Sequence, residues 1–378
     1  MNVSSMMPLT SKLYKLLGLL ILCYVGGGGF STPLYAQSDP HFMAYYYPWY
    51  NEGHWSQGYW RAELQPAQRP LLGEYDSRDR AVIQQHLTWS AAYGIDSWAL
   101  SWWGRRSWSD GTIKRFVLPE MEGKDTRFCI FYESTKLLGG LKPGGIPFEK
   151  RQIRRMKRDF RYLARHFFDH PNYLKIEGKA VVVLYLTRTF YGRYTEALQA
   201  ARTAARKQGF ELYLIGDEVF WSMPNRQRIR ELDAITAYNM HGPARFAGYP
   251  AESGFLEWVG KQYRRFQQIA QREGVDFIPN VMPGFNDRGV RPEVRHYAIP
   301  PQATEGGSAI STFKQYLDVA RPLAGSPLDI ITITSFNEWH EDTQIEPAIG
   351  PAAGSGPVQR PYTYPSYGMR YLELLREY

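Results

Sequence analysis

Residues 329–336 read DIITITSF, and the β-branched run from Ile330 to Thr334 is the clearest buried strand in the chain. Seven further short runs have the same apolar character: 42–47 (FMAYYY), 95–101 (IDSWALS), 127–133 (RFCIFYE), 180–186 (AVVVLYL), 211–217 (ELYLIGD), 233–239 (DAITAYN) and 276–282 (DFIPNVM). Longer segments with helical spacing alternate with these runs, which favours βα units and a parallel sheet. Eight strands is the number that a closed (β/α)8 barrel needs, so we predict an α/β fold of the TIM-barrel type.

The segments between the strands have the spacing and composition of helices. The predicted helices are 77–93, 147–168, 193–208, 253–273 and 309–323, with 365–377 as the closing helix. Gly-rich and Pro-rich stretches at 139–146 and 347–361 are predicted loops. We found no internal repeat or linker, so we expect one catalytic domain over residues 37–378. An open doubly wound sheet is the alternative, but no Gly-rich phosphate loop follows any strand.

The first 36 residues are typical of a secretory signal peptide. Lys12 and Lys15 precede an apolar run from Leu16 to Val25, and small residues lead to a cleavage site after Ala36. This run is shorter than the roughly 20 residues that span a bilayer, so we expect no integral membrane span after cleavage. Export to the periplasm or the cell exterior is the expected localisation. Cys129 would then be the only cysteine, and its apolar neighbours predict a buried structural thiol.

The chain is basic, with a formal net charge of +8 that falls to +6 when the predicted signal peptide and its two lysines are removed. Arginine and lysine are spread among many acids, which argues against nucleic acid as a partner. The densest basic stretch runs from Lys150 to Arg165 and contains Arg151, Arg154, Arg155, Lys157, Arg158 and Arg161. We interpret this stretch as a solvated helix face, with a patch that binds phosphate or acidic glycans as the alternative.

Catalytic groups of such a barrel are expected at the carboxyl ends of its strands. The predicted strands end in aromatic and polar residues: Tyr46, Tyr47, Trp49, Trp102, Trp103, Glu133, Tyr185, Asp217, Glu218, Tyr238, Asn239, His241, Asn280 and residues 337–341. Aromatic rings stack on the C–H faces of sugars and carboxylates bind sugar hydroxyls, so this mixture is typical of a carbohydrate site. Packing is the commoner role of any single aromatic residue, and it is their clustering that indicates function.

The strongest local motif, SFNEWHEDTQIEP, runs from Ser335 to Pro347 directly after the strand at 330–334. Its acids Glu338 and Glu341 are three residues apart, which places them on the same side of a helical turn, where they can flank one sugar ring. The spacing also fits a simpler interpretation, in which both acids stabilise the first turn of a helix through its dipole.

Residues 336–347 resemble the signature of glycoside hydrolase family 99, the endo-α-1,2-mannosidases and mannanases. Other segments resemble the family in the same order: YYYPWY at 45–50 with His54 and Trp55, then Gln85 and His86, 94–96 leading to 101–104, and Pro279 to Pro292. The resemblance covers about residues 42–348. It departs from the family pattern at Asp342, where a small residue is usual, at 131–134, and at 222–245, which matches only loosely.

The resemblance implies a retaining hydrolase of α-mannoside linkages that works through a 1,2-anhydro sugar. By this resemblance Glu338 is the base that takes the proton of the substrate's own 2-hydroxyl, and Glu341 is the acid that protonates the departing oxygen. The residues expected to contact substrate are Tyr46, Trp49, His54, Trp55, Trp102, Glu133, Tyr238, Arg288 and His340, with Tyr46 and Trp102 ranked first. Arg291 is the alternative to Arg288 as a hydrogen-bond donor, and Asp217 or Glu218 are further candidates for hydroxyl binding.

No metal or cofactor is predicted, because His54, His86, His241 and His340 lack a close His-x-His or His-x3-His spacing with a carboxylate. The expected partner is an oligosaccharide or polysaccharide. Two alternative functions remain: the same barrel acting on another surface polysaccharide, and a non-catalytic barrel that only binds glycans. The presence of both Glu338 and Glu341 argues against the second.

Overall fold

The computed structural model describes residues 39–56, 69–241, 254–287, 291, 298–299, 301, 311–325, 329–349 and 367–378. The predicted signal peptide and most of the predicted loop at 347–361 lie outside the described residues.

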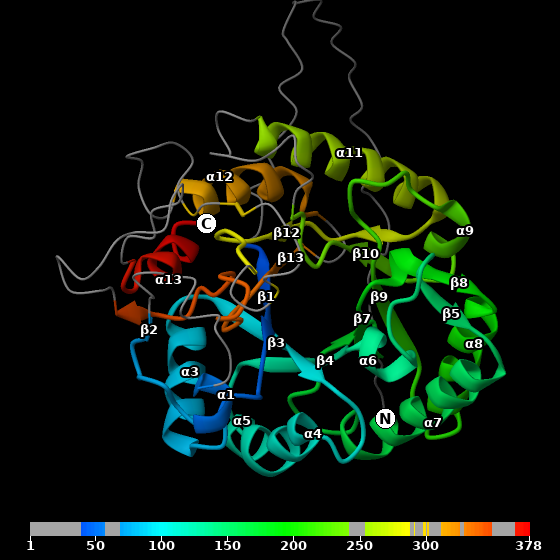
Figure 1. Cartoon of the computed structure of the whole chain (residues 1–378), viewed down its shortest axis with the longest axis horizontal. Helices are drawn as coiled ribbons and strands as arrows, with labels where there is room; N and C mark the ends of the chain where they lie inside the picture. Colours follow the sequence, from blue (N-terminus) through cyan, green and yellow to red (C-terminus); the bar gives the residue numbers. More distant parts are fainter. Residues whose placement is uncertain are drawn as a thin grey trace, which may run out of the picture. The chain divides into compact units, whose positions relative to one another are not determined.

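Parallel strands form a ring in chain order, seen end-on in Figure 1. They are β1 (His41–Tyr46), β3 (Ile95–Trp102), β4 (Arg127–Tyr132), β7 (Lys179–Leu184), β9 (Leu212–Asp217), β10 (Ala234–Thr236), the short pair β11 (Asp276–Phe277) and β12 (Asn280–Val281), and β13 (Ile330–Ile333). Each coincides with one of the eight predicted runs to within a few residues. Helices cover the outer face and side chains fill the inside, so these strands are buried on both faces and read as continuous apolar runs.

The ring closes through the segment that contains β11 and β12. β11 pairs with β10 and β12 pairs with β13, while β13 also pairs with β1. Ile278 and Pro279 interrupt the ladder, because proline has no N–H to donate. The interruption is bridged by backbone bonds from Ile278 N to Ile235 O (2.9 Å) and from Thr332 N to Pro279 O (3.0 Å). The predicted TIM-barrel fold is therefore confirmed.

The six helices predicted from the sequence all occur, with ends a few residues shorter. They are α3 (Arg80–Ala92), α7 (Lys150–His166), α8 (Tyr194–Arg206), α11 (Phe255–Glu273), α12 (Ser311–Ala320) and α13 (Arg370–Leu375). The Asp79 side chain caps α3 by accepting a hydrogen bond from Ala81 N, and α11 ends at Gly274 in the left-handed conformation. No helix in the described residues is both long enough and apolar enough to cross a membrane.

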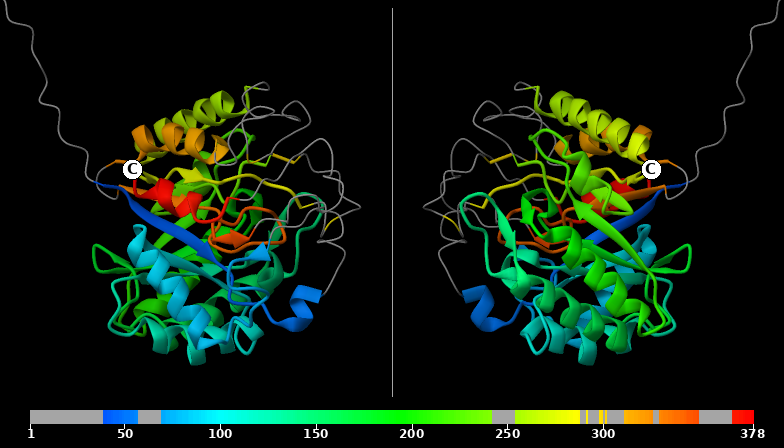
Figure 2. Two further views of the ribbon diagram at one scale, coloured as in Figure 1. Left: turned by 90° about the vertical axis from the view of Figure 1, so that its left-hand side faces the viewer. Right: turned by 90° about the vertical axis from the view of Figure 1, so that its right-hand side faces the viewer.

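Several helical pieces were not predicted. Between β3 and β4 lie α4 (Trp108–Thr112), a π-helical turn (Ile113–Val117) and α5 (Leu118–Met121). Gly111 and Pro119 obscure the helical pattern there, because both residues are poor in helix interiors. The short helices α1 (Glu52–Ser56) and α6 (Ser134–Leu138) follow the carboxyl ends of β1 and β4. Figure 2 shows α1 (blue) at the face where β1 ends, apart from the outer helices.

Alternation along β1 decides which tyrosines enter the barrel. Tyr45 packs against Phe131 and Tyr238, with ring centroids 4.7 Å and 5.2 Å away, so it lies inside the ring. Tyr46 points the other way and stacks on Trp98 at 4.3 Å. Because side chains alternate along a strand, Tyr47 returns to the inner side, at the mouth of the barrel.

Candidate active site

A cleft of about 740 Å³ opens at the carboxyl ends of the strands. It is lined by Tyr47 and Trp49 after β1, Trp103 after β3, Phe131, Glu133, Thr135 and Leu141 around the end of β4, Tyr185, Leu186, Arg188 and Thr189 after β7, Phe220 and Ser222 after β9, Tyr238, Asn239 and His241 after β10, Phe285, Asp287 and Arg291 after β12, and Glu338, His340 and Glu341 after β13. Eight strands of the ring, all except the short β11, therefore contribute to one site.

The loop after β13 is fixed to the loop after β1. The Asn337 side chain accepts a hydrogen bond from Tyr47 N (2.7 Å) and donates one to Tyr47 O (3.1 Å). The Tyr50 hydroxyl donates to Asn337 O (2.8 Å) and accepts from Trp339 N (3.0 Å). These bonds set the backbone on both sides of Glu338.

The buried carboxylate of Glu346 holds the same loop from the side that faces away from the cleft. One oxygen of Glu346 accepts hydrogen bonds from the Tyr75 hydroxyl (2.9 Å) and Trp339 Nε1 (2.8 Å). The other lies 3.0 Å from His86 Nε2, and His86 Nδ1 lies 3.0 Å from the Tyr46 hydroxyl. This buried network explains why Tyr46 and His86 are close to the site without lining it.

Glu338 is almost fully buried at the bottom of the cleft. Its backbone N–H donates to Ser335 Oγ (2.8 Å), and its carboxyl accepts from His340 N (3.0 Å). Burial raises the pKa of Glu338 to about 8, while the His340 N–H and the Arg291 charge act in the opposite direction.

Glu341 faces the same cleft but is held by a cation. Arg291 Nη1 lies 2.8 Å from one oxygen of Glu341 and 2.8 Å from Asp287. The Tyr238 hydroxyl, itself 2.6 Å from the Tyr47 hydroxyl, approaches the other oxygen at 3.4 Å. Burial raises the pKa of Glu341, Arg291 opposes that shift, and the negative charge of Glu338 adds to it.

A third carboxyl, Glu133, lies at the end of β4. The Ser101 hydroxyl donates to it (2.6 Å), and Trp103 Nε1 donates to the same Ser101 oxygen (2.8 Å). Burial raises the pKa of Glu133 to about 8, Ser101 opposes this shift, and Glu338 and Glu341 add to it. Glu133, Glu338 and Glu341 thus share one cleft with Asp287, and the raised pKa values of Glu133 and Glu338 keep these two carboxyls protonated at neutral pH.

Of the residues predicted to contact substrate, four line the cleft with the two proposed catalytic acids: Trp49, Glu133, Tyr238 and His340. His54 packs beside two of them, its ring 5.4 Å from Trp49 and 4.6 Å from His340, but does not itself line the cleft. Burial and the nearby His340 lower the pKa of His54 to about 4, which keeps it neutral. Arg288 lies outside the described residues, and its alternative Arg291 holds Glu341.

The structure places the other three predicted contacts away from the cleft. Tyr46 is bonded to His86 beneath the site. Trp55 stacks on Tyr50 at 4.2 Å and donates to Tyr75 O. Trp102 is fully buried and donates to Asp110. Their neighbours Tyr47 and Trp103 line the cleft instead, because one step along an extended chain reverses the direction of the side chain.

Asp217 and Glu218, candidates for hydroxyl binding, are occupied by the protein. Asp217 accepts from Leu186 N (3.0 Å) and Tyr238 N (2.9 Å) and pairs with Arg188, and Glu218 pairs with Arg228 at 3.0 Å. The sequence interpretation did not single out Arg188, Phe220, Phe285 or Asp287. Arg188 lies in the short turn Thr187–Thr189 after β7, which was not predicted, and Phe220 follows β9. Phe285 and Asp287 follow β12 and belong to the segment Pro279 to Pro292 that resembles the family, so both position and resemblance could have indicated them.

The histidines do not gather at one point. His86 bonds Glu346 beneath the site, while His241 stacks on Phe285 at 4.9 Å. Within the described residues, no three His, Cys, Asp or Glu side chains are grouped as a metal ion requires.

Comparison with curated proteins gives relatives that share most of this chain. Glycoprotein endo-alpha-1,2-mannosidase of Mus musculus is 24% identical over 323 residues, which cover 82% of this chain and 62% of the relative. The glycoprotein endo-alpha-1,2-mannosidase-like protein of Homo sapiens is 25% identical over 349 residues, covering 82% and 69%. The chain spans about 62% of the length of the murine relative.

Solved structures share the fold. The GH99 endo-alpha-mannosidase from Bacteroides thetaiotaomicron matches with a TM-score of 0.63 at 20% identity, over 90% of this chain and 96% of that chain. A glycoside hydrolase-like protein matches with a TM-score of 0.68 at 19% identity, over 90% and 93%. The family model described as Glycosyl hydrolase family 99 matches residues 54–357, which is most of the sequence. The chain therefore belongs to glycosyl hydrolase family 99.

Proposed function

We propose that this protein is a retaining hydrolase of α-mannoside linkages, similar to endo-α-1,2-mannosidases and mannanases, that forms a 1,2-anhydro sugar. The observation that carries the proposal is that Glu338 and Glu341, both on the loop after β13, reach one cleft that is also lined by aromatic side chains from several other strands. The names of the curated relatives support the substrate class.

In the first step, Glu338 takes the proton of the 2-hydroxyl, whose oxygen attacks C1 as the glycosidic bond breaks. Glu341 gives its proton to the departing oxygen. In an α-mannoside the 2-hydroxyl is trans to the leaving group, so the attack is intramolecular and needs no second molecule to be ordered.

In the second step, water attacks C1 and opens the three-membered ring. Glu341, now ionised, takes the proton of this water, and Glu338 returns its proton to the oxygen at C2. Two inversions at C1 give a product with the configuration of the substrate, and both carboxyls recover their starting protonation.

The raised pKa values of Glu338 and Glu341 bear on which protonation state of each carboxyl the reaction needs. Glu341 must carry a proton to act as the acid, and burial favours that form. Glu338 must be ionised to act as the base, so its pKa of about 8 predicts that Glu338 becomes fully competent as the base only above about pH 8.

The test is hydrolysis of an α-mannan and of α-mannobiosyl fluoride by the wild type, Glu338→Gln and Glu341→Gln, with the first-formed anomer followed by NMR. Removing the base should lower kcat on both substrates by about 10²–10⁴-fold. Removing the acid should be less harmful on the fluoride, because fluoride leaves with little help from a proton. Glu257→Gln, which removes an exposed carboxylate from α11, is the matched control.

An inverted first product would contradict the anhydro-sugar mechanism. Equal losses on the two substrates in Glu341→Gln would contradict its assignment as the acid. Absence of turnover on both α-mannosides by the folded wild type would contradict the substrate class and favour another surface polysaccharide.

We also propose that the protein is exported, because the first 36 residues have the pattern of a signal peptide. Fractionation of expressing cells tests this: the expected result is a product that lacks residues 1–36 and lies outside the cytoplasm. A full-length cytoplasmic product would contradict it.

A further inference from the structure

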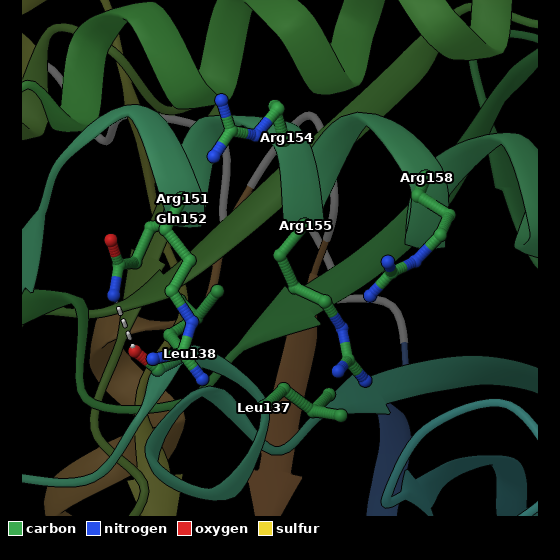
Figure 3. Close-up of a pocket in the computed structure, with 7 residues that line it drawn as sticks. All are labelled: Leu137, Leu138, Arg151, Gln152, Arg154, Arg155 and Arg158. Atoms are coloured by element: carbon green, nitrogen blue, oxygen red, sulfur yellow. Dashed lines mark hydrogen bonds between the residues drawn. The ribbon is translucent and has the colours of Figure 1, made fainter.

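A basic groove lies on the side of the barrel next to the cleft. A cavity of about 310 Å³ separates α6 from α7 and is lined by Leu137, Leu138, Gln152 and four arginines, Arg151, Arg154, Arg155 and Arg158. Figure 3 shows Arg151, Arg155 and Arg158 extending from α7 towards the two leucines. A second cavity of about 260 Å³ shares Arg158 and adds Arg105, Arg161 and Arg165. We call the two cavities together the arginine groove.

The charge of this groove is poorly balanced by the protein. Among the described residues, Asp159 is the only acid in the lining, and its carboxylate accepts from Arg155 (2.5 Å) and from the Tyr132 hydroxyl (2.9 Å). Within the part of the chain that the structure describes, Arg151, Arg154 and Arg161 form no ion pair.

The spacing of these charges lowers the stability of the helix, which a solvent-exposed face without a ligand would gain nothing from. Arg151 and Arg155, like Arg161 and Arg165, stand at i and i+4, where like charges destabilise a helix. On a solvated helix face a basic residue can be paired with an acid at this spacing, as Lys261 of α11 pairs with Glu257 at 2.6 Å. The arrangement on α7 therefore indicates an anionic ligand.

The length of the groove indicates a polymer. Arg151 and Arg165 are 14 residues apart on one helix, which corresponds to about 21 Å along its axis. A single small anion would engage one or two of these arginines, whereas an extended chain with repeated negative charges can engage the whole row. Planar guanidinium groups pair well with carboxylates, sulfates and phosphates.

The groove lies next to the cleft, and two loops contribute residues to both. Thr135 of α6 lines the cleft, and Leu137 and Leu138 of the same helix line the groove. After β3, Trp103 lines the cleft and Arg105 lines the groove. Gly104 between them has φ +105, and a Cβ atom there would lie 2.7 Å from Leu137 and 3.0 Å from Arg155. This contact brings the two loops and α7 together at the rim.

We propose that the arginine groove binds an anionic stretch of the same polysaccharide whose backbone enters the cleft, so that the preferred substrate is an acidic polymer. This inference rests on the proposed function and specifies its substrate. A polysaccharide is favoured over nucleic acid because the adjoining cleft combines carboxyl groups, which can hydrogen-bond sugar hydroxyls, with rings that can stack on the C–H faces of sugars.

The test compares an α-mannan with the same mannan after part of its C6 hydroxyls are oxidised to carboxylates. Dissociation constants are measured in a Glu341→Gln background, which prevents cleavage, and KM values in the active protein. The groove variant is Arg151→Gln/Arg158→Gln/Arg161→Gln, which leaves the Arg155–Asp159 pair in place. The control, Arg264→Gln/Arg265→Gln/Arg272→Gln, removes the same charge from exposed positions on α11.

The groove variant should bind the oxidised mannan about tenfold more weakly than the control does, and high salt should reduce this difference. Its affinity for neutral mannan should not change. The inference is overturned if the groove variant and the control lose equal affinity for oxidised mannan, or if oxidation of the mannan does not tighten its binding to the wild type. It is also overturned if single-stranded RNA competes with bound oxidised mannan as effectively as free oxidised mannan does.

The two proposals can fail separately. Arginine-dependent binding of oxidised mannan without cleavage of either polymer would contradict the proposed reaction and support the groove. Cleavage with no dependence on the groove arginines would support the reaction and overturn the groove.

Discussion

Arg291 sets the charge of the cleft, since a single nitrogen of its guanidinium contacts both Glu341 and Asp287. Its positive charge lowers the pKa of Glu338 and of Glu341. In Arg291→Gln both pKa values should therefore rise, and the whole pH profile of kcat/KM should move up by about one pH unit. Arg291→Lys, which retains the charge, should move it less. A profile that moves to lower pH in the Gln variant would contradict this electrostatic role.

Glu133 should be protonated at neutral pH, because its pKa is raised to about 8. Glu133→Gln then imitates the protonated acid, so kcat/KM should match the wild type below pH 7. Above pH 8 the two should diverge, because only the wild type gains a negative charge there. Glu133→Ala leaves the Ser101 hydroxyl without its acceptor, so kcat/KM of this variant should be lower than that of the wild type by about tenfold or more at every pH. A large loss in Glu133→Gln at pH 6 would show that the ionised form is required.

Which aromatic residues enter the cleft could not be predicted from the sequence. Tyr45, Tyr46 and Tyr47 are chemically alike, and the side of the strand that each occupies depends on register. A register shift between Phe42 and Met43 in the pairing of β1 with β3 is invisible in the sequence. The acids Glu338 and Glu341 were easier to identify, because they belong to a dozen adjacent residues that resemble a family.

At the scale of elements, the loop from Ser335 to Glu346 is held by its own last residue. The Glu346 carboxylate lies within hydrogen-bond distance of Tyr75, Trp339 and His86, and all four side chains are buried. Trp339 lies between the two proposed catalytic acids in the sequence, so Glu346 acts as a positioning residue for both. The motif sequence alone does not reveal this role of Glu346, because its partners Tyr75 and His86 come from distant parts of the chain.

Glu346→Gln should destabilise the fold by about 1–3 kcal/mol, because the amide offers an N–H where the carboxylate accepted hydrogen bonds. We expect kcat to fall more than KM rises, since the loop carries the reacting groups and the cleft walls remain. Tyr75→Phe removes one donor and keeps the acceptor, so it should have a smaller effect on both. Steady-state kinetics and urea unfolding check this. An unchanged kcat in a stable Glu346→Gln protein would contradict the positioning role.

The barrel elements were predictable because burial on both faces leaves a strong apolar signal. The runs at 180–186 and 329–336 contain the core strands β7 and β13 almost unchanged. The seventh strand was predicted as one piece, and Pro279 divides it into β11 and β12. The helical pieces at 108–121 were missed because local glycine and proline masked a segment that tertiary packing holds in place.

At the scale of the whole molecule, the cleft should reduce stability in a pH-dependent way. The pKa of Glu133 and that of Glu338 are both raised from 4.5 to about 8 by burial. Between these two values the folded protein keeps protons that the unfolded chain releases. The free energy of unfolding should therefore fall as pH rises from about 4.5 to 8, by on the order of a few kcal/mol for each carboxyl.

Glu338→Gln removes the titration of Glu338 and leaves that of Glu133. The variant should therefore be more stable than the wild type at pH 8 and equally stable near pH 4.5. Urea unfolding at pH 4.5, 6 and 8 measures the difference, and Glu257→Gln on α11 should show no gain at pH 8. A gain of the same size at every pH would mean that glutamine only packs better. A gain confined to high pH would show that the fold carries the cost of the buried acid Glu338 for the sake of the reaction, as expected where activity and stability oppose each other.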